Sequence, residues 1–336
     1  MTLPLSHIKV AEFCIHLAGP YTAMLLADQG ADVIKLETFE GDSMRGQPTS
    51  LPDSGFGLAF LSFNRNKRAI AVDYTRPKGL EVAYNLARWA DVLVINMRLK
   101  TRQRRGFTYE ELAPINPRLV YASITGYGEE GPDANFPGAD VTIQGRVGDL
   151  TARRFPEAPM PRTTRLYHFD MATAMLGAYA VTLALYDRER TGHGQRVELN
   201  LLQSALACQN AQMTQRSGSQ DRYGILPTGM PIQYPCSDGR YLLSQSIGNN
   251  FEGFCQTVGL EWVLVDPRFD TPEHRGQHAE ELAGILGQQL STRPAAEWEA
   301  MLKARDIWTT VVHDISEVYD DPQVVANQMM TKFEQP

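Results

Sequence analysis

The segment Leu166–Leu201, LYHFDMATAMLGAYAVTLALYDRERTGHGQRVELNL, joins a long apolar run to a single acidic residue near its start. No charged residue occurs between Met171 and Tyr186. Apolar residues occupy every face of a helix over this run, and such a helix is typically buried on all sides. Gly192 is typical of a helix C-terminus, and Arg196–Leu201 alternates like a strand. The segment therefore predicts a buried helix that leads into a strand.

Asp170 is the acidic residue at the start of this run. A carboxylate in the first turn of a helix is stabilised by the positive end of the helix dipole and accepts free backbone N–H groups. One interpretation is therefore a helix N-cap. The other is a nucleophile, since an ionised carboxylate at the edge of an apolar core is able to form a covalent acyl intermediate. These residues alone leave both interpretations open.

On the N-terminal side of this segment, short apolar strands alternate with helices. The predicted strands are Ile8–Phe13, Ala31–Leu36, Ala69–Asp73, Ala90–Asn96 and Leu119–Ile124, and the clearest helices are Pro20–Gln29 and Gly79–Trp89. This alternation predicts an α/β fold with a mostly parallel sheet of four or five strands, covered by helices on both faces. Ligands of such sheets bind beyond the carboxyl ends of the strands, so we expect the site in the segments that follow them.

The chain of 336 residues is long enough for two domains. Residues 1–216 form the predicted large domain, whose last helix runs from Asn200 to about Arg216. Residues 217–235 are rich in Gly and Pro and form a predicted linker. A smaller α+β domain is predicted over residues 236–325. Its expected elements are helices at 250–258, 277–290 and 294–304 and a strand at Thr310–Val312.

The composition limits the class of protein and its partners. The net charge of −7 argues against nucleic acid or anionic membrane as a partner, because both attract a basic surplus. The four cysteines show no CxxC pair and no disulfide-like spacing, which predicts free thiols in a reducing compartment. The N-terminus lacks the pattern of a signal peptide, and the uncharged run is shorter than the ~20 residues that span a bilayer. A cytoplasmic protein is predicted.

Two segments that follow strands suit a small anionic ligand. The loop HLAGP, residues 16–20, begins a helix, and the free N–H groups of a helix N-terminus favour anions. Its single Gly19 does not fit the GxGxxG pattern, which disfavours a dinucleotide-binding enzyme. Five basic residues lie between Arg98 and Arg105. This cluster is either solvated surface or a site for a multiply phosphorylated ligand.

Several blocks of the sequence together resemble one family, the class III coenzyme A transferases, which includes formyl-CoA transferase and carnitine CoA-transferase. In chain order the blocks are AGPYTAMLLADQGADVIKLE with GDSMR, SFNRNKRAIAVD, ADVLVINMR, NPRLVYASITGYGEEGP, Asp170 with LALYDRERTGHGQRVELNLL, and PCSDGRYLL, DPRF and DPQVVANQMM. The resemblance covers nearly the whole chain.

The resemblance implies a Rossmann-like large domain, a small α+β domain and a homodimer of two interlocked chains. It also implies exchange of CoA between an acyl-CoA and a free carboxylic acid, which are the expected partners. The catalytic aspartate of the family falls on Asp170, which would carry an aspartyl intermediate. No metal and no permanently bound cofactor is expected, because the CoA thioester is the substrate.

The CoA contacts of the family carry over to residues at strand ends. They fall on His16, Leu17, Ala18, Asn96, Met97 and Arg104. Arg104 suits a phosphate, and Asn96 would lie near the adenosine or the pantetheine arm. Formyl-CoA transferase has glutamine at the position of Leu17, so only backbone contacts are expected there. Its glycine-rich small-domain loop has no counterpart in GILPTGMPIQY, residues 224–234, which argues against formate and oxalate as substrates.

Two alternatives remain. The α-methylacyl-CoA racemases resemble this chain in the aspartate but add a histidine as a second base on the other face of the α-carbon. The matching position here is Ala139, so a racemase would need His168 in its place. The other alternative is a shortened, inactive relative. Chains of the family continue beyond DPQVVANQMM, so residues 326–336 are expected to be a truncated C-terminal return.

Overall fold

The computed structural model describes most of the chain. The described residues are 2–46, 56–152, 162–164, 166–214, 232–244 and 250–332. The chain divides into two compact units, Met1–Tyr223 and Gly224–Pro336, which are considered separately. Most of the predicted linker lies outside the described residues, but its end, Gln233–Pro235, is strand β7 rather than linker. All four cysteines are free thiols, as predicted.

A six-stranded parallel sheet organises the first unit. Its strands are β1 (Lys9–Phe13), β2 (Asp32–Glu37), β3 (Lys67–Ala71), β4 (Val92–Ile95), β5 (Val120–Thr125) and β6 (Arg196–Asn200). Their order is β3-β2-β1-β4-β5-β6, and every neighbouring pair is parallel. The sequence predicted a mostly parallel sheet of four or five strands. The sixth is the strand predicted after the apolar helix, which adds to the edge beside β5.

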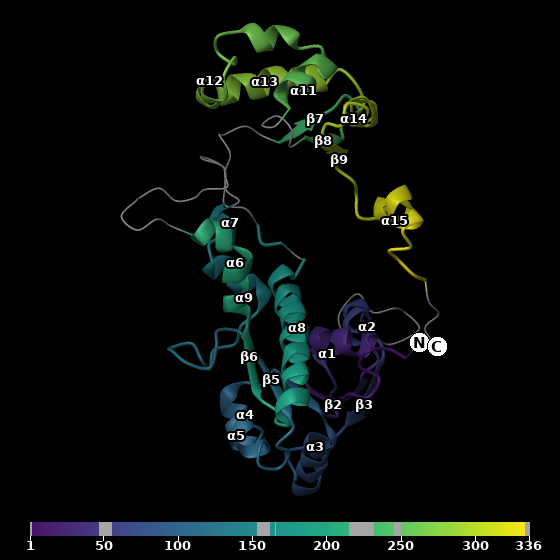
Figure 1. Ribbon diagram of the computed structural model, residues 1–336, viewed down its shortest axis with the longest axis vertical. Coiled ribbons are helices and arrows are strands. Elements are labelled where there is room, and N and C mark those ends of the chain that lie inside the picture. The colour runs from purple at the N-terminus through teal and green to yellow at the C-terminus, as the bar shows by residue number, and fades with distance from the viewer. Residues whose placement is uncertain are drawn as a thin grey trace. The chain divides into compact units, whose positions relative to one another are not determined.

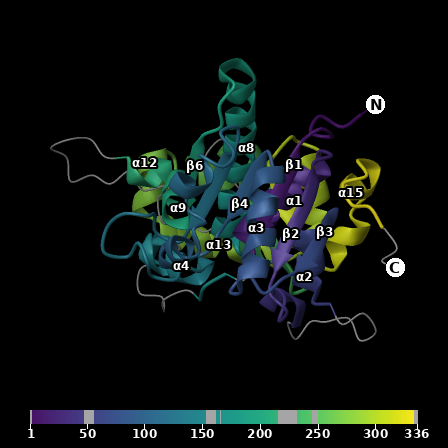
Figure 2. The same ribbon diagram turned by 90° about the horizontal axis from the view of Figure 1, so that it is seen from below.

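Alternate residues of the strands pack against helices on opposite faces of the sheet. Val10, Val33 and Val94 pack with helices α1 (Ala18–Asp28) and α8 (His168–Thr191), which lie side by side in Figure 1. Ala11 and Leu93 belong to the core on the other face, which includes residues of α3 (Pro77–Trp89) (Figure 2). The near-continuous apolar strands of the sequence follow from this burial on both faces.

Shorter elements complete the first unit. They are η1 (Ser43–Gly46), α2 (Leu58–Asn64), α4 (Leu99–Arg105), α5 (Tyr109–Leu112), α6 (Asp140–Arg146), α7 (Asp149–Ala152), α9 (Leu201–Cys208) and α10 (Asn210–Met213). The helix predicted to begin at Pro20 begins two residues earlier, at Ala18. The helix predicted from Asn200 to Arg216 is interrupted at Gln209, so it forms α9 and α10 instead.

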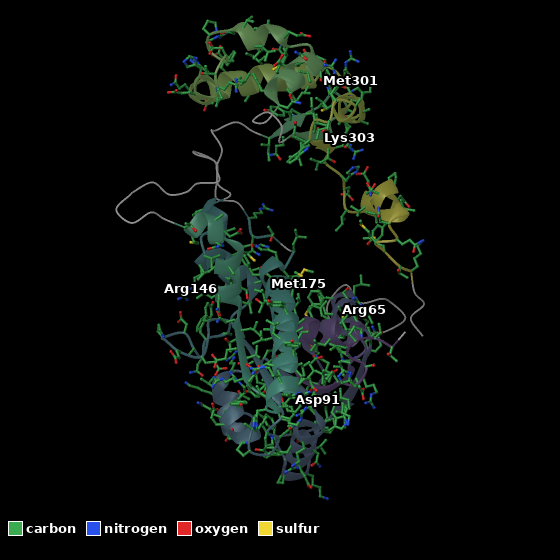
Figure 3. All side chains as sticks on the ribbon, in the orientation of Figure 1. Arg65, Asp91, Arg146, Met175, Met301 and Lys303 are labelled. Carbon is green, nitrogen blue, oxygen red and sulfur yellow. The ribbon has the colours of Figure 1, made fainter. Side chains whose placement is uncertain are left out.

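Helix α8 differs from its prediction in both length and burial. It has 24 residues and continues through the charged turn to Thr191, where the buried Arg188 pairs with Asp91 at 3.0 Å. The prediction of burial on all sides is wrong for the single chain: Met175 is 52% exposed, Tyr179 64% and Tyr186 78%. These residues follow helical spacing and form one face. Figure 3 marks Met175 near one end of α8 and Asp91 near the other.

The opposite side of α8 is covered within the unit. By length and composition alone, α8 is apolar enough to cross a membrane. It packs, however, against α1, β6 and α9, and its buried residues include Phe169, Ala174 and Val181. These contacts bury one side of α8 within the first unit.

The second unit is a small α+β domain, as predicted. Its strands β7, β8 (Tyr241–Ser244) and β9 (Thr309–Val311) form an antiparallel sheet. Its helices are α11 (Phe251–Val258), η2 (Glu261–Val265), α12 (Pro272–Gln277), α13 (Ala279–Leu290), α14 (Ala295–Lys303), η3 (Glu317–Asp320) and α15 (Pro322–Ala326). The core is built around Trp298, whose indole N–H donates to the carbonyl of Leu290.

Four buried charged side chains connect three strands of the first unit. Lys35 Nζ lies 2.6 Å from Glu12 Oε1 and 3.0 Å from Asp42 Oδ2, and Lys67 Nζ lies 2.8 Å from Glu12 Oε2. Burial alone would raise the pKa of Glu12, but the two ammonium groups outweigh it and lower that pKa. Glu12 is therefore a buried anion whose stability depends on both lysines.

We expect Glu12→Gln to lower the free energy of unfolding by about 3–5 kcal/mol, because it leaves buried ammonium groups without their shared anion. Urea denaturation at pH 7 measures this loss. The matched control is Asp32→Asn on β2, which removes an exposed pair with Arg68 and should leave stability close to that of the wild type. Equal losses in the two variants would contradict a special role for the buried cluster.

Candidate active site

A cavity of about 670 Å³ lies in the first unit, at the carboxyl ends of β1, β4 and β5. From β1 the sheet is extended to one side by β2 and β3 and to the other side by β4, β5 and β6. Ligands of such folds bind between the two strands where the order reverses, here β1 and β4. The cavity therefore lies where the sequence predicted the site. Its lining includes Asp170 and five of the six residues expected to contact CoA: His16, Leu17, Ala18, Asn96 and Met97.

Asp170 is the third residue of α8 and forms part of this lining. Within the described residues, its side chain makes no hydrogen bond. Tyr167, at the N-cap position, has a left-handed conformation and also makes no side-chain cap. The interpretation of Asp170 as an N-cap is therefore wrong. Its carboxyl group is not used to complete the helix.

Asp140 supplies the missing cap from a different helix. Its Oδ2 accepts hydrogen bonds from the backbone N–H groups of Phe169 at 2.8 Å and Asp170 at 3.1 Å. Its Oδ1 accepts a hydrogen bond from the side chain of Gln144. Asp140 is only 2% exposed. The sequence analysis missed this residue, because an aspartate that begins a short helix carries no signal of a partner thirty residues later.

The surroundings of Asp170 change its ionisation. Burial, and second the nearby carboxylate of Asp140, raise the pKa of Asp170 to about 7. An aspartate ordinarily ionises near pH 4. Asp170 therefore gains its charge as the pH rises through neutrality, and it is a stronger base than an exposed aspartate.

The turn after β1 forms one wall of the cavity. His16 has a left-handed backbone conformation with φ 67°, which a non-glycine residue adopts only when its surroundings enforce it. Asp42 of the buried charged cluster accepts a hydrogen bond from the His16 backbone N–H at 3.3 Å, and Lys35 donates to the carbonyl of Cys14 at 2.8 Å. The cluster thus holds the turn that carries His16, Leu17 and Ala18.

Asn96 holds the same turn from the adjacent strand end. Its Oδ1 accepts from the backbone N–H of Ile15 at 3.0 Å, and its Nδ2 donates to the Ile15 carbonyl at 2.7 Å. Both atoms of the amide are therefore engaged with the protein itself. Asn96 lines the cavity, and the structure shows it fixing the β1–α1 turn.

Arg104 is not among the residues that line the cavity. Both Arg104, on α4, and Arg98, immediately before α4, are exposed, but of the two only Arg98 lines the cavity. The guanidinium of Arg98 has no hydrogen bond or ion pair with any described residue. The basic segment therefore contributes Arg98 to the cavity wall, with a guanidinium that is unpaired among the described residues.

The second possible base lies outside the cavity wall. Ala139 lines the cavity, but His168 does not. The Nδ1 of His168 lies 3.0 Å from Thr164 Oγ1.

The loop before Ala139 is held by a close contact between backbones: a Cβ on Gly126 would lie 2.5 Å from the Cα of Gly138. Within the described residues, no group of three or more His, Cys, Asp or Glu side chains is arranged to hold a metal ion.

Comparison with known proteins agrees with the earlier resemblance. The model of CoA-transferase family III matches residues 5–336. Succinate–glutarate CoA-transferase of Agrobacterium fabrum is 32% identical over 98% of this chain and 85% of its own. Acetyl-CoA:oxalate CoA-transferase of Acetobacter aceti is 30% identical over 98% of this chain and 86% of its own.

A solved structure has the same fold. The crystal structure of a CaiB/BaiF family protein from Brucella suis superposes with a TM-score of 0.88, at 31% identity, over 98% of this chain and 89% of that one. The six-stranded parallel sheet and the small antiparallel sheet are thus those of a known architecture. The chain belongs to CoA-transferase family III and is an enzyme that transfers CoA between acyl groups.

Proposed function

We propose that this enzyme moves CoA from an acyl-CoA to a free carboxylic acid through a covalent intermediate on Asp170. The observation that carries the proposal is the Asp170 carboxyl group. It lies in the wall of the cavity, it is not used to cap its helix, and its pKa is raised to about 7 by burial and by Asp140. The names of the relatives, which include succinate, glutarate and oxalate, support a carboxylic acid as acceptor.

The proposed chemistry needs only this one carboxylate. One oxygen of Asp170 attacks the thioester carbonyl, the C–S bond breaks, and CoA leaves as a thiolate, which gives a mixed anhydride. The thiolate then attacks the Asp170 carbonyl carbon, which releases the first acid as a carboxylate and leaves an aspartyl-CoA thioester. The acceptor carboxylate then attacks the carbonyl carbon of the aspartyl-CoA thioester, which releases CoA thiolate and gives a second mixed anhydride. The thiolate attacks the acceptor's carbonyl carbon in this anhydride, which forms the new acyl-CoA and releases Asp170 as a carboxylate. Every nucleophile and leaving group is an anion, so no second base is required.

The racemase alternative is less well supported. A two-base racemase needs a proton acceptor on each face of the α-carbon. The position of its histidine is Ala139, which lines the cavity but carries no base, and His168 is not part of the lining. The inactive-relative alternative predicts no chemistry at Asp170 at all, so one experiment separates the three.

The same cavity is proposed to bind CoA. The N-terminus of α1, at Ala18, offers backbone N–H groups to an anion. Two arginines are candidate phosphate ligands: Arg104 from the resemblance, and Arg98 from its position in the cavity wall. Leu17 offers only its backbone, and Asn96 contributes by holding the turn.

The proposed assembly is a homodimer of interlocked chains. The exposed face of α8 brings together Met175, Tyr179, Leu183 and Tyr186. Soluble monomers rarely expose contiguous apolar patches of large side chains. A second copy of the chain is the occupant that the family resemblance suggests for this face.

We expect Asp170→Asn to abolish CoA exchange, because the amide is too weak a nucleophile to open a thioester. Asparagine has nearly the same volume as aspartate, so folding should be preserved. Wild-type enzyme incubated with a competent acyl-CoA and hydroxylamine should convert Asp170 to its hydroxamate, seen as a mass change on the peptide HFDMATAM. The substrates are found by screening CoA thioesters against organic acids by mass spectrometry.

The outcomes separate the alternatives. A racemase would move deuterium from solvent to the substrate α-carbon without an Asp170 adduct, and an inactive relative would do neither. Exchange that persists in Asp170→Asn would refute the transferase mechanism.

Arg104→Ala should weaken CoA binding about tenfold or more if the guanidinium contacts a phosphate, since hydrogen bonds to charged groups contribute about 1.5–3 kcal/mol. The affinity for dephospho-CoA should fall less in this variant if Arg104 contacts the 3′-phosphate, which dephospho-CoA lacks. Arg98→Ala is the matched comparison, and isothermal titration calorimetry measures both. Unchanged affinity in Arg104→Ala with a loss in Arg98→Ala would transfer the role to Arg98.

Tyr179→Glu should convert the dimer to monomers, because it places a charge in the middle of the exposed apolar face of α8. Sedimentation velocity at micromolar concentration measures the change. The control is Lys78→Glu on α3, which lies on the other side of the sheet and should leave the dimer intact. A wild-type protein that sediments as a monomer at this concentration would remove the proposal.

A further inference from the structure

We propose that Asp140, held by Gln144, is a positioning residue for this enzyme: it fixes the first turn of α8 and so directs the Asp170 carboxyl group into the cavity. The inference rests on the proposed role of Asp170 as the nucleophile. It assigns to Asp140 a role in the reaction without contact to the substrate's reacting atoms.

The geometry of the cap carries the first step. The first N–H groups of a helix have no partner within the helix, and a side chain at the N-cap position usually accepts one of them. Here Tyr167 occupies that position with φ 49° and makes no such bond. One oxygen of Asp140 accepts both the Phe169 and the Asp170 N–H groups instead. The starting point of α8 is therefore determined by α6.

Gln144 extends this control to the chain before α8. It lies one turn after Asp140 on α6 and is fully buried. Its Nε2 donates to Asp140 Oδ1 and, at 3.2 Å, to the carbonyl of Thr164, while its Oε1 accepts the Thr164 N–H at 2.9 Å. Asp140 and Gln144 thus form a rigid unit that holds the backbone on both sides of Tyr167.

The charge of Asp140 carries the second step. Its carboxylate accepts three hydrogen bonds, and its charge is one cause of the raised pKa of Asp170. The charged or titratable groups that line the cavity with Asp170 and Asp140 include His16, Glu37, Tyr74, Arg98 and Tyr167, and His168 lies two residues before Asp170. The facing parts of α1 and α9 contribute no charged side chain. Of these charges, that of Asp140 is the one that shifts the pKa of Asp170.

This fixed charge favours the covalent intermediate over the free carboxylate. An Asp170 anion is repelled by Asp140, whereas the anhydride and the aspartyl-CoA thioester are neutral at Asp170. Forming either intermediate moves the negative charge of Asp170 away from Asp140 and onto the leaving group, which is the CoA thiolate in the first step and the released carboxylate in the second. Asp140 therefore both orients the Asp170 nucleophile and raises its basicity.

Asp140→Asn tests both effects. In one orientation of the introduced asparagine, its Nδ2 faces the Nε2 of Gln144 and the hydrogen bond to Gln144 is lost. In the other orientation, its Nδ2 faces the backbone N–H groups of Phe169 and Asp170 and the cap on α8 is lost. We expect kcat for CoA exchange to fall on the order of 100-fold, as for a displaced catalytic group, with little change in the KM for acyl-CoA. The pH dependence should also move. Wild-type activity rises as Asp170 ionises near pH 7, and loss of the Asp140 charge should shift this rise to lower pH.

The double variant Asp140→Asn with Gln144→Glu is the rescue. The introduced asparagine is then able to donate to one oxygen of the introduced glutamate, and the other oxygen accepts the Thr164 N–H. The hydrogen-bond pattern is thus largely restored with the charge moved away from Asp170. We expect recovery of part of kcat while the pH midpoint stays low. Asp133→Asn, which removes an exposed ion pair with Arg146, is the control for a charge change near α6.

Two measurements without substrate make the proposal independent of activity. Carbon-13 NMR of labelled aspartates, with Asp170→Asn for assignment, follows the titration of Asp170, and amide hydrogen exchange reports protection of Phe169 and Asp170. A lower titration midpoint and faster exchange in Asp140→Asn support the proposal. Wild-type values of kcat, titration and exchange in that variant would overturn it. If wild-type enzyme forms no Asp170 adduct but these two readouts still change, the proposed function fails while the hold of Asp140 on α8 stands.

Discussion

Two hydrogen bonds from the first turn of α8 to one oxygen of Asp140 determine where the central helix of the large unit begins. Because α8 packs against α1 and β6, its start also sets the register of that packing. At the other end, Arg188 pairs with Asp91 beside β4. The helix is held at both ends by charged side chains from elsewhere in the chain. Asp170 is thus placed through its backbone, and its own side chain makes none of these contacts.

The rest of the cavity is held in the same indirect way. The turn after β1 has little regular structure, and His16 adopts a backbone conformation that is unfavourable by itself. Asp42 and Lys35 of the buried cluster bond to this turn, and Asn96 bonds to both backbone groups of Ile15. Burying these charges is costly unless each is paired, so the cluster and the turn stabilise one another.

A carboxylate whose side chain makes no hydrogen bond with the described residues suits exchange between anions. Acyl transfer between a thiolate and carboxylates needs a nucleophile that leaves as readily as it attacks, and it needs exclusion of water from the reactive intermediates. The raised pKa of Asp170 and the small side chain of Ala139 in the cavity wall fit this requirement better than a two-base proton transfer. The exposed apolar face of α8 is the surface on which we propose that a second copy packs.

The sequence by itself determined the strands of the large unit, their parallel sheet and the main helices, because apolar periodicity and the family blocks are local properties of the chain. It also indicated the edge of the sheet at which the cavity lies, since the carboxyl ends of parallel strands meet at one edge of a sheet. It did not determine which residues hold the site. Asp140 and Asp170 are far apart in the chain, and the structure alone brought them together. Likewise, Arg98 and Arg104 look equivalent in the sequence, and only the direction of the chain into α4 decided that Arg98 lines the cavity. The burial of α8 was mispredicted because composition shows only that a helix is apolar. Tertiary packing decides which faces of that helix are covered by other parts of its own chain.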